Sequence, residues 1–294
     1  MIIDARCRLT TREAGAYFAK VMKERGLYHL IPAFEDGTIE GFFKEIGDAG
    51  ITTAVSASGN SPGARAGRRQ MPDRTASNDY MADMQAKHPG KLISVAGIDA
   101  GSVFHNALEE IDRCHGMGLR AVFIEPGRSP ACYPDDRRIY PIYEKCVERN
   151  MTVIIQTSGN WAGTLVDCAN PKYIDQVAVD FPKLRIVAAH GCYPFIREAI
   201  TVASRHENVY MEPDVYMLHL GAEDWVKAVN QNSFGFEDKY LFGSAYPLYP
   251  IKPFVEAFFK LPWKQEVLPK ILYKNALRAF NLENDPTFKA MYKL

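Results

Sequence analysis

The sequence has none of the spacings that mark a disulfide-rich protein or a cysteine-based metal site. Its six cysteines form no Cys-x-x-Cys pair and no zinc-ribbon spacing. In a chain of 294 residues such cysteines are expected to be reduced thiols, which indicates a cytoplasmic compartment. The first residues do not combine a basic region with a long apolar one, so no secretory signal is expected.

Long apolar runs and an excess of charge of one sign are also missing. No stretch approaches the roughly 18 consecutive apolar residues that a membrane-spanning helix needs. Lys and Arg together number 35, as do Asp and Glu, so the formal net charge at pH 7 is zero. A neutral chain offers no broad basic surface for nucleic acid or for an anionic membrane. The expected partner is therefore a small molecule.

Short apolar runs alternate along the chain with helix-like segments. Several runs are continuously apolar, such as Ala-Val-Phe-Ile at 121–124, which is typical of strands buried on both faces. Segments such as 107–115 and 141–149 carry apolar residues at three- and four-residue steps, as amphipathic helices do. Eight strands are predicted, at 1–5, 51–57, 92–97, 119–124, 152–155, 185–189, 208–211 and 239–242.

This alternation predicts an α/β fold with parallel strands inside and helices outside, in a single domain over 1–294. Eight strand–helix units favour a closed (β/α)8 TIM barrel, which typically takes about 250 residues. An open doubly wound sheet is the alternative, but no Gly-x-Gly-x-x-Gly phosphate loop follows the first strand. Insertions are predicted at about 9–50 and 59–74.

The second insertion is rich in glycine and arginine. Loops that follow the strands build the active-site face of such barrels, so Arg65 is a candidate for the mouth of a pocket, together with Arg68, Arg69 and Arg74. A solvated charged loop is the alternative interpretation, because charged side chains are mostly exposed.

Polar side chains stand where the predicted strands end. Because the carboxyl ends of the strands meet at one end of a barrel, these side chains are expected to share one site. In chain order they are Asp4, Arg6, Cys7, Arg8, Glu125, Gln156, Thr157, Ser158, His190, Cys192, Glu212, Asp214, Ser244 and Tyr246.

Four short motifs resemble the amidohydrolase-related (amidohydrolase 2) family. They are Ile-Ile-Asp-Ala at 2–5, Ala-Ala-His-Gly at 188–191, Asn-Val-Tyr at 208–210 and Phe-Gly-Ser-Ala-Tyr-Pro at 242–247. The resemblance covers nearly the whole chain. It implies relatives that are decarboxylases, hydratases and lactonases acting on aromatic and ring-fission acids, and it leaves a homodimer open as the assembly.

The family's metal-binding pattern is mostly absent. The resemblance implies His-x-His after the first strand, one His after each of strands five and six, and an Asp in the last motif. This chain has Arg6, Arg8, Gln156 and Ala245 at four of these positions and keeps only His190. Arginine has no lone pair to offer a cation, so we expect no metal ion and no cofactor. The alternative is a new metal site built from Glu125, His190, Glu212 and Asp214.

Arg6 and Arg8 are two residues apart on a strand, so they are expected to lie on the same side. A planar guanidinium fits a carboxylate with two hydrogen bonds, and both residues are predicted to bind the carboxylate of a substrate or a developing oxyanion. The alternative is that they form internal salt bridges with Asp4, Glu125 or Asp214, because an unpaired buried charge is costly.

His190 is the predicted acid–base residue, with a structural histidine as the alternative. Nearby arginine charges are expected to lower its pKa. Asp214 and Glu212 are predicted to orient His190 or to act as the base, with a helix N-cap as the alternative for Asp214. Further substrate contacts are predicted for Glu125, Gln156, Trp161, Ser244, Tyr246 and Arg65.

Three functions follow from these residues. The favoured one is a metal-independent, lactonase-like hydrolase of a small cyclic or aromatic carboxylic acid, with His/Asp acid–base chemistry and arginine binding the anion. The second is a metal-independent decarboxylase, another lyase or an isomerase acting on a similar acid. The third is a non-catalytic barrel that binds an acidic ligand, although sequence drift alone does not predict two new arginines on one face.

Overall fold

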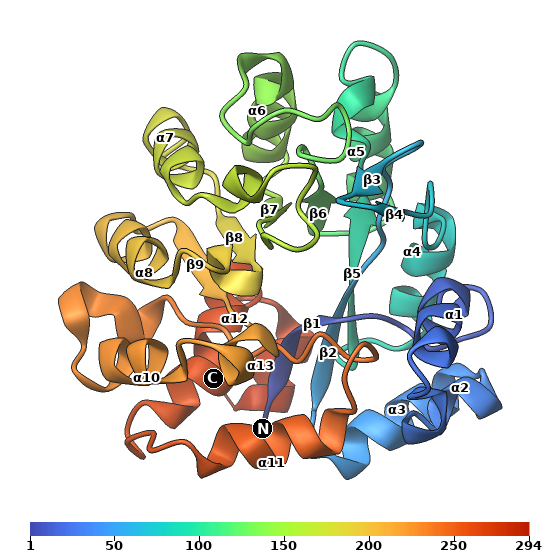
Figure 1. Cartoon of the computed structure of the whole chain (residues 1–294), viewed down its shortest axis with the longest axis vertical. Helices are drawn as coiled ribbons and strands as arrows, with labels where there is room; N and C mark the ends of the chain where they lie inside the picture. Colours follow the sequence, from blue (N-terminus) through green and yellow to red (C-terminus); the bar gives the residue numbers. More distant parts are fainter. Residues whose placement is uncertain (294) are drawn as a thin grey trace.

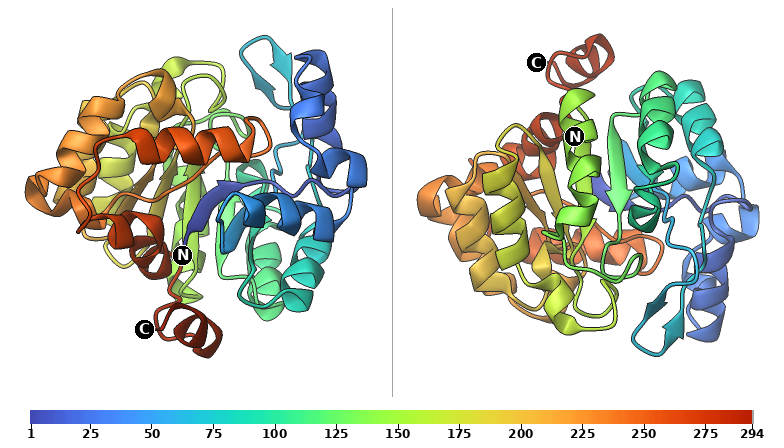
Figure 2. Two further views of the ribbon diagram at one scale, coloured as in Figure 1. Left: turned by 90° about the horizontal axis from the view of Figure 1, so that it is seen from below. Right: turned by 90° about the horizontal axis from the view of Figure 1, so that it is seen from above.

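A ring of parallel strands surrounded by helices makes up the computed structural model, which describes residues 1–293 (Figure 1; Figure 2). Within these residues seven strands form one sheet in the order β1-β2-β5-β6-β7-β8-β9. Every neighbouring pair is parallel, so the α/β barrel predicted from the sequence is confirmed. The strands are Ile3–Cys7 (β1), Thr53–Ala57 (β2), Leu92–Gly97 (β5), Ala121–Ile124 (β6), Thr152–Gln156 (β7), Ile186–Ala189 (β8) and Val209–Glu212 (β9).

The helices lie outside the ring and bury one face against the strands (Figure 1). Helix α5 shows the pattern, since its buried residues Ala107, Ile111 and Cys114 are spaced by four and three positions. The helices are Ala16–Glu24 (α1), Ala33–Asp36 (α2), Ile39–Asp48 (α3), Asn78–Lys87 (α4), Ala107–Gly116 (α5), Tyr140–Glu148 (α6), Lys172–Asp180 (α7), Ile196–Arg205 (α8), Tyr216–His219 (α9), Ala222–Asn230 (α10), Ile251–Lys260 (α11), Asn275–Ala279 (α12) and Pro286–Tyr292 (α13).

Both predicted insertions carry secondary structure of their own. Residues 9–50 contain α1, α2 and α3, and residues 59–74 contain a two-stranded antiparallel hairpin, Arg65–Ala66 (β3) and Arg69–Gln70 (β4). The insertions follow β1 and β2, so both start from the carboxyl ends of the strands. No helix within residues 1–293 is long and apolar enough to cross a membrane.

The eighth predicted strand, at 239–242, is not a regular strand. Residues 240–246 instead make separate hydrogen bonds to the strands on either side. Tyr240 forms an isolated bridge with Met211 of β9, and the N–H of Ala5 in β1 donates to the carbonyl oxygen of Phe242 at 2.8 Å. The barrel is therefore closed by single contacts along this segment, where the sequence predicted a continuous ladder.

Asp4 links β1 to this closing segment. Its Oδ1 accepts the backbone N–H groups of Arg6 and Ser244, each at 3.0 Å, and its Oδ2 accepts the Ser244 hydroxyl. Burial raises the pKa of Asp4 to about 7, although the three hydrogen bonds act in the opposite direction. Asp4 and Ser244 therefore belong to the closure of the barrel.

Replacing Asp4 with asparagine is expected to raise Tm at pH 8 by about 3 °C or more and to leave it unchanged near pH 4. The pKa of Asp4 is raised from 3.8 to about 7 on folding, so the ionised carboxyl group costs stability as the pH rises through that interval. Asparagine carries no charge and still offers an oxygen to both N–H groups. Thermal denaturation of both proteins from pH 4 to pH 8 measures the effect, and a difference in Tm that does not change with pH would contradict it. Asp4→Ala, which lacks the acceptor, should be less stable at every pH.

The amino-terminal end of the barrel is covered by the C-terminal helices. The Tyr292 hydroxyl lies 2.7 Å from Oγ1 of Thr53, and the Thr152 hydroxyl donates to the carbonyl oxygen of Ala279 at 2.6 Å. Thr53 and Thr152 are the first residues of β2 and β7, so α12 and α13 lie at the start of the strands. Both chain ends lie at this end of the barrel (Figure 2). The carboxyl ends of the strands lie at the other end of the barrel, where the predicted site residues are.

Candidate functional site

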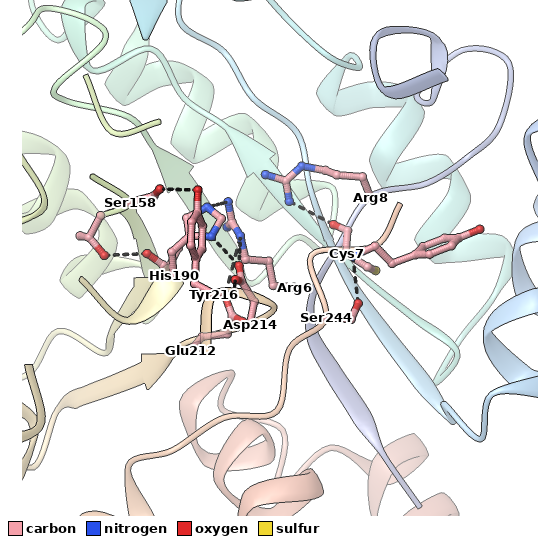
Figure 3. A network of polar contacts seen from close by, with 12 residues as sticks. Arg6, Cys7, Arg8, Ser158, His190, Glu212, Asp214, Tyr216 and Ser244 are labelled. Atoms are coloured by element: carbon pink, nitrogen blue, oxygen red, sulfur yellow. Dashed lines mark hydrogen bonds and ion pairs between the residues drawn. The ribbon is translucent and has the colours of Figure 1, made fainter. Parts of the chain in front are cut away.

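Arg6, His190 and Asp214 meet at the carboxyl ends of β1, β8 and β9 (Figure 3). Nη2 of Arg6 lies 2.8 Å from Nε2 of His190, and Nδ1 of His190 contacts Oδ2 of Asp214. A guanidinium group can only donate, so Nε2 is the acceptor and the imidazole hydrogen is on Nδ1. The surroundings of His190 therefore favour one tautomer, with the hydrogen on the nitrogen that contacts the carboxylate.

His190 is neutral in this arrangement. Burial lowers the pKa of His190 to about 4, and the charge of Arg6 lowers it further, while Asp214 acts in the opposite direction. The lowering expected from the arginine charges is confirmed, although burial is the larger cause. A neutral imidazole is suited to accept a proton and is a poor donor.

Asp214 fills both roles that the sequence left open. One carboxylate oxygen, Oδ2, contacts His190, while Oδ1 accepts the N–H of Tyr216 at 3.1 Å at the start of α9. Its backbone is left-handed, with φ of 46°, a conformation that non-glycine residues rarely adopt. His190 itself has φ of 67°. Backbone strain of this kind often accompanies functional positions.

Arg6 is the counter-ion of two buried carboxyl groups. Its Nε lies 3.5 Å from Oδ2 of Asp214 and 3.8 Å from Oε2 of Glu212. Burial raises the pKa of Glu212 well above its ordinary value, and the charge of Asp214 raises it further, while the charge of Arg6 acts in the opposite direction. Of the salt bridges expected for Arg6, the one to Asp214 is present, and Glu212 adds a second.

Arg8, in contrast, has no carboxylate partner within residues 1–293. Its Nη1 donates to the carbonyl oxygen of Cys7 at 3.0 Å, and its guanidinium lies over the ring of Phe123, 5.2 Å from the centroid. Burial and the like charge of Arg6 lower the pKa of Arg8 to about 9, which still leaves it protonated at neutral pH. The two arginines therefore differ in kind: Arg6 is internally neutralised, and Arg8 is a cation available to an anion.

Phe123 lies beneath both arginines. Arg6 is 5.3 Å from the ring centroid, close to the value for Arg8, which confirms that the two side chains share one side of β1. The negative face of an aromatic ring attracts each guanidinium and offsets part of their mutual repulsion. Phe123 was not identified from the sequence, because its apolar run looks like any other core strand.

Replacing Phe123 with leucine is expected to weaken the binding of an acidic ligand about fivefold, because both cation–π contacts are lost. The dissociation constant of a small aromatic carboxylate, followed by calorimetry, measures this. Val95→Ala is the matched control, since Val95 belongs to the same inner core and has no aromatic ring to offer the arginines. It should lower Tm without changing affinity, and an equal loss of affinity in both variants would contradict the positioning role.

A cavity opens at this end of the barrel, with mainly apolar walls around the charged groups. Nine of the predicted site residues, Tyr246 among them, lie around it or directly behind it. Lining residues include Arg6, Arg8, Phe18, Val21, Glu125, Gln156, Trp161, His190 and Leu248, and Glu212 and Asp214 lie behind Arg6. We call it the acid cavity. Gln156 is buried there, and its Oε1 finds no hydrogen-bond donor within residues 1–293.

Glu125 lines the acid cavity but is paired within the protein. It contacts Nη1 of Arg128, and its Oε2 accepts the hydroxyl of Ser61 at 3.0 Å. Arg128 also donates from Nε to the carbonyl oxygen of Trp161 at 2.6 Å. The pair thus fixes the loop that carries Trp161. Arg128 was not predicted from the sequence, because it lies four residues beyond the end of β6.

Two predicted substrate contacts, Ser244 and Arg65, lie apart from this cluster, and a third, Tyr246, borders the cavity but packs against a helix. The Ser244 hydroxyl is used by Asp4, as described above. Tyr246 borders the acid cavity, but its ring packs against Phe42 of α3 with centroids 6.0 Å apart. Arg65 is exposed in β3 and donates to the carbonyl oxygen of Arg68 at 3.4 Å. The insertion does reach the mouth, through Arg69, which lies 4.9 Å from the ring centroid of Trp161.

The donor set does not fit the divalent metal ion that the family resemblance implies. Within the described part of the chain no three His, Cys, Asp or Glu residues gather in a metal-binding arrangement. Nε2 of His190 and Oδ2 of Asp214 both face the guanidinium of Arg6, which repels a cation and offers it no lone pair. No chemical step is therefore assigned to a metal here.

The strand ring, the outer helices and a polar cluster at the carboxyl ends of the strands define an α/β barrel of the TIM type. The family model described as Amidohydrolase matches residues 45–282, and the chain belongs to this family. An uncharacterised TIM-barrel protein from Bordetella bronchiseptica is 34% identical, with a TM-score of 0.83 over 96% of this chain and 98% of that one. No curated protein sequence matches the chain.

More distant solved structures share the fold. A 2,6-dihydroxybenzoate decarboxylase from Rhizobium is 17% identical, with a TM-score of 0.64 over 84% of this chain and 89% of that one. A probable 2-pyrone-4,6-dicarboxylic acid hydrolase from Acinetobacter baumannii is 13% identical, with a TM-score of 0.57 over 83% of this chain and 89% of that one. At these identities the likeness is one of fold.

Proposed function

We propose that the protein is a metal-independent, lactonase-like hydrolase of a small cyclic or aromatic carboxylic acid. The observation that supports this most is Arg8, a cation without a carboxylate partner that lines an apolar-walled cavity beside the His190–Asp214 pair. Relatives in fold are named for a pyrone dicarboxylic acid and for dihydroxybenzoate, which are both carboxylic acids. In this proposal the substrate carboxylate binds Arg8 through two hydrogen bonds.

His190 is the general base in this mechanism. The contact with Asp214 favours the hydrogen on Nδ1, so Nε2 keeps its lone pair. Arg6 donates to that lone pair in the unliganded protein, and the reacting carbonyl oxygen, as it becomes negatively charged, offers Arg6 a stronger acceptor, which frees Nε2 for water. The substrate carboxylate also offsets the two positive charges that lower the pKa of His190, so the base becomes stronger once substrate is bound.

Hydrolysis then consumes one water molecule for each ester bond. Water adds to the carbonyl carbon as His190 takes its proton, and Arg6 offsets the charge that develops on the carbonyl oxygen. The carbon–oxygen bond of the ring breaks, and His190 returns the proton to the leaving oxygen. The product is an open-chain hydroxy acid, or its keto form when the ring oxygen was part of an enol.

A decarboxylase acting on a similar acid is the second candidate, favoured by the apolar walls that Phe18, Val21 and Leu248 give the acid cavity. Removing water from a carboxylate assists the loss of CO2, because the charge becomes dispersed in the transition state. A lyase also needs a group that protonates carbon, and His190, with its pKa lowered to about 4, is a poor acid at neutral pH. Hydrolysis therefore remains the favoured reaction.

A panel of lactone carboxylic acids and aromatic carboxylic acids tests the proposal, using protein treated with a strong chelator. We expect ring opening of at least one lactone acid, unchanged by chelation and reduced about a thousandfold in kcat/KM by His190→Gln. Release of CO2 without ring opening would favour the lyase. Activity that requires added zinc or manganese, or that survives His190→Gln, would overturn the proposed mechanism.

A further inference from the structure

We propose that the substrate extends beyond a single-ring acid and carries, on the far side of the reacting bond, a planar aromatic group bound in a second compartment. This inference rests on the proposed function, because it places the acid group at Arg8 and the reacting bond at His190. It adds a second binding subsite and narrows the substrate to acids with an aryl extension.

The second compartment opens directly beside the acid cavity. Its own walls are Asn160, Tyr193, Val215, Tyr216, His219 and Tyr249, and we call it the aromatic compartment. Five further residues line both spaces: Val21, Trp161, His190, Ala245 and Leu248. The two spaces therefore adjoin, and His190 lies in the wall that they share. A ligand held at Arg8 and attacked beside His190 has its remaining atoms directed into the aromatic compartment.

The rings of this compartment are held in place by neighbouring groups. Tyr216 meets His190 edge-on, with centroids 5.2 Å apart and an interplanar angle of 89°. The Ser158 hydroxyl donates to the Tyr216 oxygen at 3.0 Å (Figure 3). Tyr193 stacks on Tyr216 with centroids 4.6 Å apart and an interplanar angle of 24°. A ligand ring that joins such a fixed wall gains stacking contacts without ordering mobile side chains.

Charge limits what this compartment accepts. No Asp or Glu is among the described residues that line it, and its charged groups are the exposed Arg25 and Arg69. Arg69 already lies over the Trp161 ring, and Arg25 donates to the carbonyl oxygen of Leu248 at 2.8 Å. A rim of guanidinium groups attracts the face of an electron-rich ring or an anionic substituent and repels an ammonium group. The extension is therefore a neutral or anionic aryl group.

The same hydrolysis applies to such a substrate. Water provides hydroxide to the carbonyl carbon and a proton to the oxygen on the aryl side. An aryl ester then yields a carboxylic acid and a phenol, and an aryl-substituted lactone yields one open-chain acid that carries the phenol or enol. The acid end remains near Arg8, and the aryl end lies in the aromatic compartment.

Calorimetric binding of two probes, benzoate and biphenyl-4-carboxylate, tests the inference. In the unmodified protein we expect biphenyl-4-carboxylate to bind about tenfold more tightly than benzoate, because the second ring buries apolar surface. Tyr193→Ala should bring the ratio of the two affinities close to 1, and Tyr193→Phe, which keeps the ring, should preserve it. Tyr249→Ala is a second variant of the same wall, should Tyr193→Ala fail to fold.

Different variants test this inference and the proposed function independently. Arg8→Met should weaken both probes by the same factor and leave their ratio unchanged. If Arg8→Met weakens neither probe, while the ratio of the two affinities persists and still depends on Tyr193, then the acid site is wrong and the aromatic compartment is supported. Equal affinity of the two probes in the unmodified protein, or a ratio that neither alanine variant lowers, would overturn the aromatic compartment.

Discussion

Replacing Arg8 with methionine is expected to lower kcat/KM for an acidic substrate by about a hundredfold, mainly through KM. Arg8 lacks a carboxylate partner within residues 1–293, so its hydrogen-bonding capacity is directed to a ligand. Methionine fills a similar volume without charge, and no internal carboxylate loses a partner. Tm should therefore stay within about 2 °C of the unmodified protein, or rise, because an unpaired buried charge has been removed.

Arg8→Lys is the graded control for this prediction. Lysine keeps the charge and loses the planar fork, so an intermediate loss of about tenfold is expected. A neutral amide analogue of the substrate should be turned over equally by the unmodified protein and by Arg8→Met. Equal losses for acid and amide would mean that Arg8 shapes the cavity and does not recognise the anion.

Replacing Asp214 with asparagine is expected to lower kcat by about a thousandfold with little change in KM. An amide nitrogen placed against Nδ1 of His190 donates a hydrogen, which moves the imidazole hydrogen to Nε2. That tautomer has no lone pair for water and sets a donor against the Nη2 group of Arg6, which lies 2.8 Å away. The pH profile of kcat and the imidazole 15N shifts in NMR spectra would report the change of tautomer.

Glu212→Gln is the matched control, because it lies beside the same arginine. Burial raises the pKa of Glu212 well above its ordinary value, which favours the uncharged acid, and glutamine is close to that form in shape and charge. We expect kcat to change by less than about threefold. A loss as large as that of Asp214→Asn would show that the charge of the buried cluster matters more than the tautomer of His190.

The fold could be predicted from the sequence because buried parallel strands carry a strong and simple pattern. Apolar runs such as 121–124 and 152–155 coincide with β6 and β7. The closing segment at 240–246 could not be predicted, since its apolar residues look like a strand while its geometry depends on the side chain of Asp4. The first strand, Ile3–Cys7, is displaced by two residues from the predicted range of 1–5. Because it ends at Cys7, Arg6 lies within β1.

The sequence predicted which residues lie together at the site, but it did not predict which of their side chains form ion pairs. Strand ends locate residues at one end of a barrel, so His190, Asp214 and the two arginines could be grouped from the sequence. Which arginine is neutralised depends on distances of 3.5 Å and 3.8 Å to Asp214 and Glu212, and no sequence pattern encodes these. The sequence likewise did not predict that Arg128 pairs with Glu125 or that Phe123 lies beneath the arginines, because both contacts depend on which way each side chain points.

The guanidinium groups around the two compartments also have a kinetic consequence. The protein is neutral overall, yet Arg8, Arg25, Arg69 and Arg128 line adjoining spaces in which Glu125 is the one carboxylate among the described lining residues. A cleft lined by one sign of charge, with low-dielectric walls, concentrates field lines and draws oppositely charged solutes from solution. Capture of an acidic substrate should therefore slow as salt shortens the screening length to about 8 Å and below, while its rate of escape changes far less. Zero net charge thus conceals a local field that guides anions towards His190.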